Sequence, residues 1–151
     1  MRRRLEQWRS LPPWDRLLLA QLLILLPFIG AALRLLGFRG TRDLLERFSP
    51  AHPTPSRPYS ADLAEDAQRS ARLVGIAARH RPYRATCLRQ SLALWWLLRR
   101  RGISTELRIG VRMDSGALRA HAWVEFCGRP LGQQTLGFSA FQDSCSTAEI
   151  S

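Results

Sequence analysis

The chain has 151 residues, of which 46% are hydrophobic and 23% are charged. This length and composition fit one compact folding unit with a hydrophobic core, and they argue against a disordered chain. The net charge of +11 comes from 23 arginines without any lysine, and these arginines are spread through the chain. Proteins that bind nucleic acids usually gather basic residues in one patch or stripe, so we expect no nucleic-acid partner.

The three cysteines are Cys87, Cys127 and Cys145, and no two of them form a C-x-x-C pair. An odd count without a secretory signal argues against a disulfide scaffold and favours a reducing cytoplasm. A zinc site built from these cysteines and His121 is conceivable, but their spacing carries no metal signature. We therefore expect no metal cofactor.

The first predicted element is the leucine-rich run from Leu17 to Leu33, which follows a basic start. It is shorter than the roughly 20 apolar residues that span a bilayer comfortably. No small-residue cleavage site follows it, so a signal peptide is not expected. Pro27 lies inside the run and removes a backbone donor, which predicts two apolar helices broken near that residue. Weak membrane association through residues 17–38 stays an open alternative.

A proline-rich connector follows, "SPAHPTPSRPYS" from Ser49 to Ser60. It contains His52, which we expect to be exposed. Ser60 is a typical N-cap residue and acidic residues follow it, so we predict a helix from there to about His80. His80 itself, between two arginines, fits a basic helix end better than a catalytic role. The apolar face of this helix comprises Leu63, Ala67, Val74 and Ala78.

The next segment, "RATCLRQSLALWWLLRRRG", carries signals for both ends of a helix. Thr86 can cap its start, arginines suit its negative end, and Gly102 suits the left-handed position after it. Cys87 becomes the first helical residue, where the positive end of the helix dipole favours a thiolate. Cysteine is also among the most buried residue types, so both readings stay open for this helix alone. The shared apolar face comprises Leu88, Leu92 and Trp95.

After Gly102 the hydrophobic period changes from 3.6 to 2. We predict one strand with Leu107, Ile109, Val111 and Met113 on its buried face, a turn at Asp114–Gly116, and a second strand ending at Phe126. "CGRP" predicts another turn, and "LGQQ" from Leu131 predicts the start of a third strand. His121 lies on the second strand, on the face it shares with Arg119, Trp123, Glu125 and Cys127.

A thiolate nucleophile needs a base that accepts and returns its proton, and a histidine does this near neutral pH. His121 can meet Cys87 if its strand crosses the start of the Cys87 helix. A base is usually oriented by a third polar group, for which Gln133 and Gln134 are candidates. Glu125 is expected to form an exposed charge pair instead. The alternative for His121 is a strand histidine with only local hydrogen bonds.

Three strings, "CLRQSLALWWLLRRRGI", "LRIGVR" and "AHAWVEFCGRPL", resemble the transglutaminase-like cysteine proteases of lasso-peptide biosynthesis. The resemblance covers residues 60–134, and "LPPWDRLLLAQLLILL" resembles the N-terminal helices of these proteins. It implies an α+β fold, in which N-terminal helices precede a transglutaminase-like or papain-like core with the catalytic helix packed on a small antiparallel sheet. The expected division is an N-terminal helical region and connector at 1–59, the protease core at 60–136 and a loosely ordered tail at 137–151.

Proteins of this kind remove the leader from a ribosomal precursor peptide, so that a separate asparagine-synthetase-like cyclase can close the lasso ring. In many systems a separate small protein recognises the leader, and the short length here leads us to expect that split form, since no independent recognition domain fits before residue 60. The implied partners are the precursor peptide, the recognition protein and the cyclase. Neither a metal nor an organic cofactor is implied.

Carried over residue by residue, the resemblance makes Cys87 the nucleophile and His121 the general base and then acid. The family usually has an aspartate where this chain reads Gly132, Gln133, Gln134. An amide can orient a histidine, so Gln133 is the expected orienter. The alternative is a protein that keeps the fold without turnover and serves as a binding scaffold. Asp143 in the tail is a further carboxylate that could reach His121.

Overall fold

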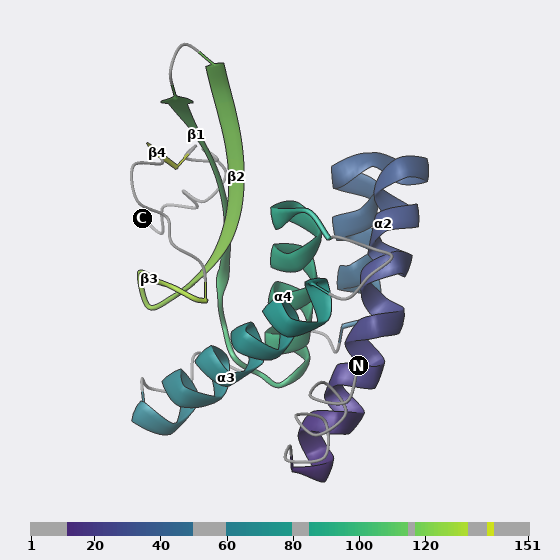
Figure 1. The fold of residues 1–151 in the computed structure, drawn as a ribbon, viewed down its shortest axis with the longest axis vertical. Coiled ribbons are helices and arrows are strands. Elements are labelled where there is room, and N and C mark those ends of the chain that lie inside the picture. Colours follow the sequence, from purple (N-terminus) through teal and green to yellow (C-terminus); the bar gives the residue numbers. More distant parts are fainter. Residues whose placement is uncertain (1–11, 50–59, 80–84, 115–116, 133–138, 141–151) are drawn as a thin grey trace, which may run out of the picture.

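The computed structural model describes residues 12–49, 60–79, 85–114, 117–132 and 139–140. Within these residues, three helices precede a four-stranded antiparallel sheet with the order β3-β2-β1-β4, and this confirms the predicted α+β class. Figure 1 shows α4 between α2 and the sheet. The elements are α2 (Pro13–Arg47), α3 (Ala61–Ala78), α4 (Cys87–Arg100), β1 (Glu106–Asp114), β2 (Ala117–Phe126), β3 (Arg129–Pro130) and β4 (Ser139–Ala140).

The apolar run folds as one long helix, so the predicted break near Pro27 is wrong. Pro27 lies inside α2, and the non-helical backbone is at Gly37 instead, with φ 68° and ψ −173°. A proline costs one helical hydrogen bond, but Leu26 and Ile29 beside it are buried in the core and hold both flanks in place. Gly37 bends the helix because glycine adopts a positive φ without a steric penalty.

α3 forms as its sequence predicts. The Ser60 hydroxyl oxygen accepts a hydrogen bond from the Leu63 backbone N–H at 3.3 Å, which confirms the N-cap. The helix ends at Ala78, two residues before His80. His52 and His80 lie outside the described residues. On the predicted apolar face, Ala67, Val74 and Ala78 are buried and Leu63 is partly buried.

α4 is the central element of the core. Every residue from Ser91 to Leu98 is buried, and the helix contacts α2, α3 and β2. Gly102 has a φ of 73° just past the helix end, as the sequence predicts. Thr86 occupies the N-cap position, but its side chain makes no capping hydrogen bond, so that part of the prediction is wrong.

The sheet is built on the predicted hairpin of β1 and β2, whose last pair is Asp114 with Ala117. On one face of β2, Ala122, Val124 and Phe126 are buried, and on the other face Trp123 is buried as well. On β1 the predicted buried face is only partly covered: Leu107, Ile109 and Val111 are half-buried, and Met113, near the tip of the hairpin, is 66% exposed. The hairpin extends past the helices there, as Figure 1 shows.

The third strand begins earlier than predicted and is short. β3 consists of Arg129–Pro130, directly after a turn at Cys127 and Gly128, so "LGQQ" does not start it. Gly132 has a φ of 71°, and a Cβ there would lie 2.8 Å from the Cβ of Ala71 on α3. This close approach and the left-handed backbone end the pairing with β2. Gln133, Gln134, Asp143 and Cys145 lie outside the described residues.

One hydrophobic core joins α2, α3, α4 and the end of β2. Its largest fully buried side chains include Leu19, Leu22 and Ile29 of α2 together with Leu92 and Leu98 of α4. An ion pair at 2.8 Å between Asp15 of α2 and Arg69 of α3 supports the same contact. The N-terminal helix is therefore part of the scaffold that holds α4.

Candidate functional site

The start of α4, which carries Cys87, is held from two sides. Gln90 donates a side-chain hydrogen bond to the Ala85 carbonyl at 2.8 Å. The backbone N–H of Ala85 in turn donates to the Ala78 carbonyl at the end of α3. On the α2 side, the guanidinium of Arg89 packs so closely on Gly30 that a Cβ there would lie 3.0 Å from the Arg89 Cζ atom. The position of the half-buried Cys87 is thus set by both preceding helices.

Within the described residues, the N-terminal end of α4 lacks a cap from its N-cap side chain. The first N–H groups of a helix have no partner within the helix, and the dipole makes that end positive. The Thr86 side chain, the usual source of a cap, makes no such bond here. The backbone around Cys87 can therefore donate hydrogen bonds to a negatively charged oxygen.

Ser91, one turn after Cys87, joins α4 to the edge of β2. Its hydroxyl donates to the Ala122 carbonyl at 2.8 Å, and the side chain is buried. The Leu131 N–H bonds to the Val124 carbonyl on the side of β2 that faces away from β1. Carbonyls two residues apart on a strand point the same way, so Ala122 offers its carbonyl at that same edge. Ser91 thus takes the place that a longer β3 would occupy.

The hydrogen bond between Ser91 and Ala122 fixes where Cys87 lies along the direction of β2. A helix rises about 1.5 Å per residue and a strand about 3.3 Å, so the four residues from Ser91 back to Cys87 match about two strand residues. The end of α4 leads to Glu106 at the start of β1, and Glu106 pairs with Glu125 near the end of β2. Because β1 and β2 are antiparallel, α4 and β2 run in the same general direction. Cys87 therefore lies at the start of the element that contacts the strand of His121.

His121 is half-buried on β2, on the opposite face from Ala122 and Val124. Its ring stacks on that of Trp123 with centroids 6.1 Å apart and planes 19° apart. Its direct cross-strand partner on β1 is Gly110, which has no side chain to cover the imidazole. Burial lowers the pKa of His121 from its ordinary value of 6.5, which favours the neutral imidazole that a general base requires.

The Glu125 side chain binds Trp123 and not His121. Its carboxylate accepts a hydrogen bond from the Trp123 indole N–H at 2.7 Å and pairs with Arg108 at 3.4 Å. Arg108 also pairs with Glu106 at 2.6 Å. The predicted charge pair is confirmed, although only 20% of the Glu125 side chain is exposed. These contacts hold the indole that stacks on His121.

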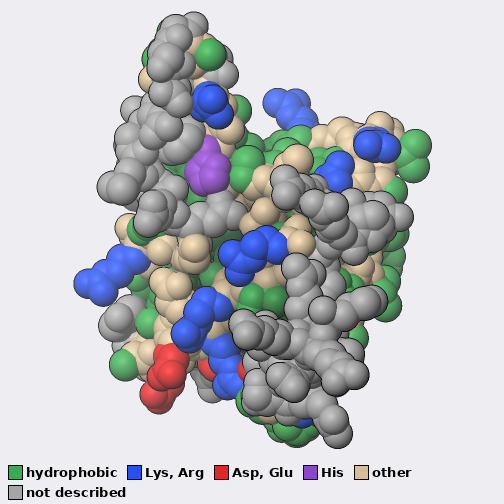
Figure 2. Space-filling view, in the orientation of Figure 1, with side chains coloured by type: hydrophobic (Ala, Val, Ile, Leu, Met, Phe, Trp, Pro, Cys, Tyr) green, Lys and Arg blue, Asp and Glu red, His purple; other side chains and the backbone are tan. Residues whose placement is uncertain are grey.

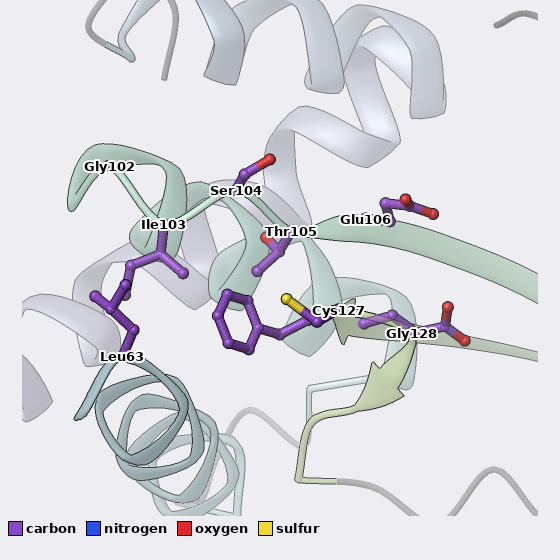
Figure 3. Close-up of a pocket in the computed structure, with 10 residues that line it drawn as sticks. Leu63, Gly102, Ile103, Ser104, Thr105, Glu106, Cys127 and Gly128 are labelled. Carbon is purple, nitrogen blue, oxygen red and sulfur yellow. The ribbon is translucent and has the colours of Figure 1, made fainter. Parts of the chain in front are cut away.

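Cys127 lies at the opposite end of α4, in the turn after β2, and is exposed with a φ of 49°. It lines a pocket of about 200 Å³ together with Ile103, Thr105 and Glu106, as Figure 3 shows. Neither Cys87 nor His121 lines this pocket. Among the residues that the structure describes, no three His, Cys, Asp or Glu side chains are grouped to hold a metal ion.

The structure brings the Cys87 helix against the His121 strand, but it does not test the role of Gln133, which lies outside the described ranges. The sequence interpretation missed Ser91, whose spacing of four residues from Cys87 places both on one helix face. A small polar residue among the apolar positions of that helix is the signal that could have identified it.

A comparison with protein-family models supports the same architecture. The model described as the transglutaminase-like superfamily matches residues 25–144, which include most of α2 and all of α4, β1 and β2. No curated protein and no solved structure matches the chain significantly. Because the match covers far more than half of the chain, this protein belongs to the transglutaminase-like superfamily.

Proposed function

We propose that this protein is a cysteine peptidase that removes the leader from a lasso-peptide precursor before a separate cyclase closes the ring. One observation carries most of the proposal: Cys87 begins α4, and Ser91 binds that helix to β2 next to His121. Cys-His catalysis needs a thiol and an imidazole within reach of each other, and a thiol at a helix start whose helix contacts the histidine strand supports this pairing. The family match supports the cysteine-protease fold, and the motif resemblance supports the lasso-peptide substrate.

In the proposed reaction, His121 takes the proton of the Cys87 thiol, and the thiolate attacks the carbonyl at the leader–core junction. The negative oxygen of the tetrahedral intermediate is held by the backbone N–H of Cys87. When the C–N bond breaks, protonated His121 gives its proton to the leaving amine, which is the N-terminus of the core peptide. Water, deprotonated by His121, then hydrolyses the thioester and releases the leader with a free carboxylate.

The third catalytic position remains Gln133 in this proposal, with Gln134 as its neighbour. An amide orients an imidazole by hydrogen bonding but stabilises the imidazolium less than a carboxylate does. We therefore propose a slow peptidase that depends on partners to position its substrate. These partners are the precursor peptide, a separate leader-recognition protein and an asparagine-synthetase-like cyclase, and the proposed chemistry uses neither a metal nor an organic cofactor.

The test is a cleavage assay with purified protein, precursor peptide and recognition protein, in which mass spectrometry measures the released leader. We expect Cys87→Ala to lower the cleavage rate by about 10³-fold or more, because the nucleophile is lost. Cys127→Ala is the matched control and should cleave like the wild type, since Cys127 lies at the other end of α4.

Equal cleavage by the wild type and Cys87→Ala would remove the assignment of the nucleophile. If the wild type does not cleave the precursor but still binds the complex of precursor and recognition protein, the noncatalytic scaffold alternative replaces the peptidase.

A further inference from the structure

A second feature of the molecule, independent of the Cys87 site, is the outer face of α2. Five large apolar side chains on this face are between 51% and 83% exposed. Their spacing of three, seven, four and seven residues places them on one side of a helix, and we refer to them as the α2 stripe. The stripe comprises Trp14, Leu17, Ile24, Phe28 and Leu35.

The opposite face of α2 is not available to a partner. Leu19, Leu22 and Ile29 are at most 1% exposed in the core shared with α3 and α4. Asp15 is buried and paired with Arg69. By length and composition alone, α2 is long and apolar enough to cross a membrane, with a mean hydropathy of 2.1 over 18 residues. A spanning orientation would remove these leucines from the core and bury Asp15 in lipid, so the fold favours a helix that lies on a surface.

The charges beside the stripe indicate what covers it. Between Pro13 and Leu36, the exposed charged side chains are Arg16 and Arg34, both of them basic. A second copy of the chain would bring like charges together, and each chain has a net charge of +11. An anionic surface is the complementary partner. Figure 2 shows basic side chains among hydrophobic ones over the part of the molecule that α2 occupies.

The geometry points to a bilayer of anionic phospholipids as the occupant of the α2 stripe: α2 lies in the membrane interface with its outer side chains among the acyl chains. A helix with exposed Trp, Phe and Leu and flanking arginines is typical of interfacial attachment. Because α4 packs on the inner face of α2, the Cys87 site is then held close to the membrane surface while the sheet extends away from it.

The test is vesicle flotation with the full chain, using vesicles of phosphatidylcholine alone and of phosphatidylcholine with phosphatidylglycerol. We expect binding to the anionic vesicles to exceed binding to the neutral ones by about tenfold or more at low salt, and to weaken as salt rises. Ile24→Gln combined with Phe28→Gln should lower this binding by about tenfold or more, since two exposed apolar side chains are lost from the contact.

Met113→Gln is the matched control, because it also replaces an exposed apolar side chain, but at the hairpin tip. It should bind vesicles like the wild type, and circular dichroism should show that all variants remain folded. Equal flotation of the stripe variant and the control would overturn the proposal. So would a stable dimer of the wild type that the stripe variant dissociates, without any vesicle binding, since a second copy would then cover the stripe. Neither outcome depends on cleavage activity.

Discussion

The two ends of α4 offer different chemistry. At its start, Cys87 is half-buried at the positive helix end, where Thr86 makes no side-chain cap, and its helix contacts the strand of His121. At its end, Gly102 reverses the chain, and an open pocket is lined by Cys127 with Glu106 and Glu125. The positive helix end stabilises a thiolate or an oxyanion, whereas carboxylates and the negative helix end disfavour both. The pocket therefore lies at the end of the helix that is the less suited to nucleophilic catalysis.

The difference between the two ends of α4 is tested most strongly by measuring the reactivity of the Cys87 and Cys127 thiols. We expect iodoacetamide to alkylate Cys87 at least about tenfold faster than Cys127 near neutral pH, because His121 is proposed to take the proton of the Cys87 thiol. Accessibility alone predicts the opposite order, since Cys127 is the more exposed. His121→Ala should slow the alkylation of Cys87 without changing that of Cys127, and it should lower cleavage by about 10²–10⁴-fold.

Peptide mapping by mass spectrometry gives both alkylation rates in one experiment. Similar rates for the two cysteines, or a His121→Ala variant in which Cys87 reacts as before, would contradict a paired thiol and imidazole.

The contact between α4 and β2 can be tested by removing its hydrogen bond. Ser91→Ala leaves the buried Ala122 carbonyl without this donor, which we expect to lower the free energy of unfolding by about 1–3 kcal/mol. Because the start of α4 is then less firmly placed beside β2, kcat for leader cleavage should fall while KM changes little. Urea denaturation and steady-state kinetics measure the two effects.

Ser70→Ala is the matched control for this variant. Ser70 is equally buried, but its hydroxyl bonds to the Asp66 carbonyl in its own helix and accepts from Arg101 at the far end of α4. We expect a loss of stability of similar size with an unchanged kcat for the folded protein. An equal fall in kcat for both variants would show that only stability matters.

A pair of glycine variants gives the smallest expected effect: Gly102 lies at the far end of α4, and Gly75 in α3 serves as its comparison. Gly102 has a φ of 73° and open space around its Cβ position, so Gly102→Ala should cost about 1–2 kcal/mol through backbone conformation only. Gly75 also has open space, but it lies inside α3, and Gly75→Ala should stabilise the protein by about 0.4–1 kcal/mol. Thermal unfolding measures both signs, and changes of the same sign would contradict the conformational explanation.

Local signals predicted the ends of α3 and α4 well, because a serine cap and a glycine stop act through bonds to backbone atoms a few residues away. Predictions failed where distant contacts outweigh local preference. The helix continues through Pro27 because α3 and α4 pack against its flanks, and β3 ends early because Gly132 lies against Ala71 of α3. Thr86 is a good capping residue by type, yet its side chain makes no cap.

The sequence by itself determined that Cys87 begins a helix and that His121 lies on a strand, since both follow from periodicity and from backbone hydrogen bonding over short distances. Only the tertiary structure decided that these two elements meet, through a bond between Ser91 and Ala122, which are 31 residues apart. It also decided which face of the apolar α2 is buried, because both faces are hydrophobic and only packing against α3 and α4 distinguishes them.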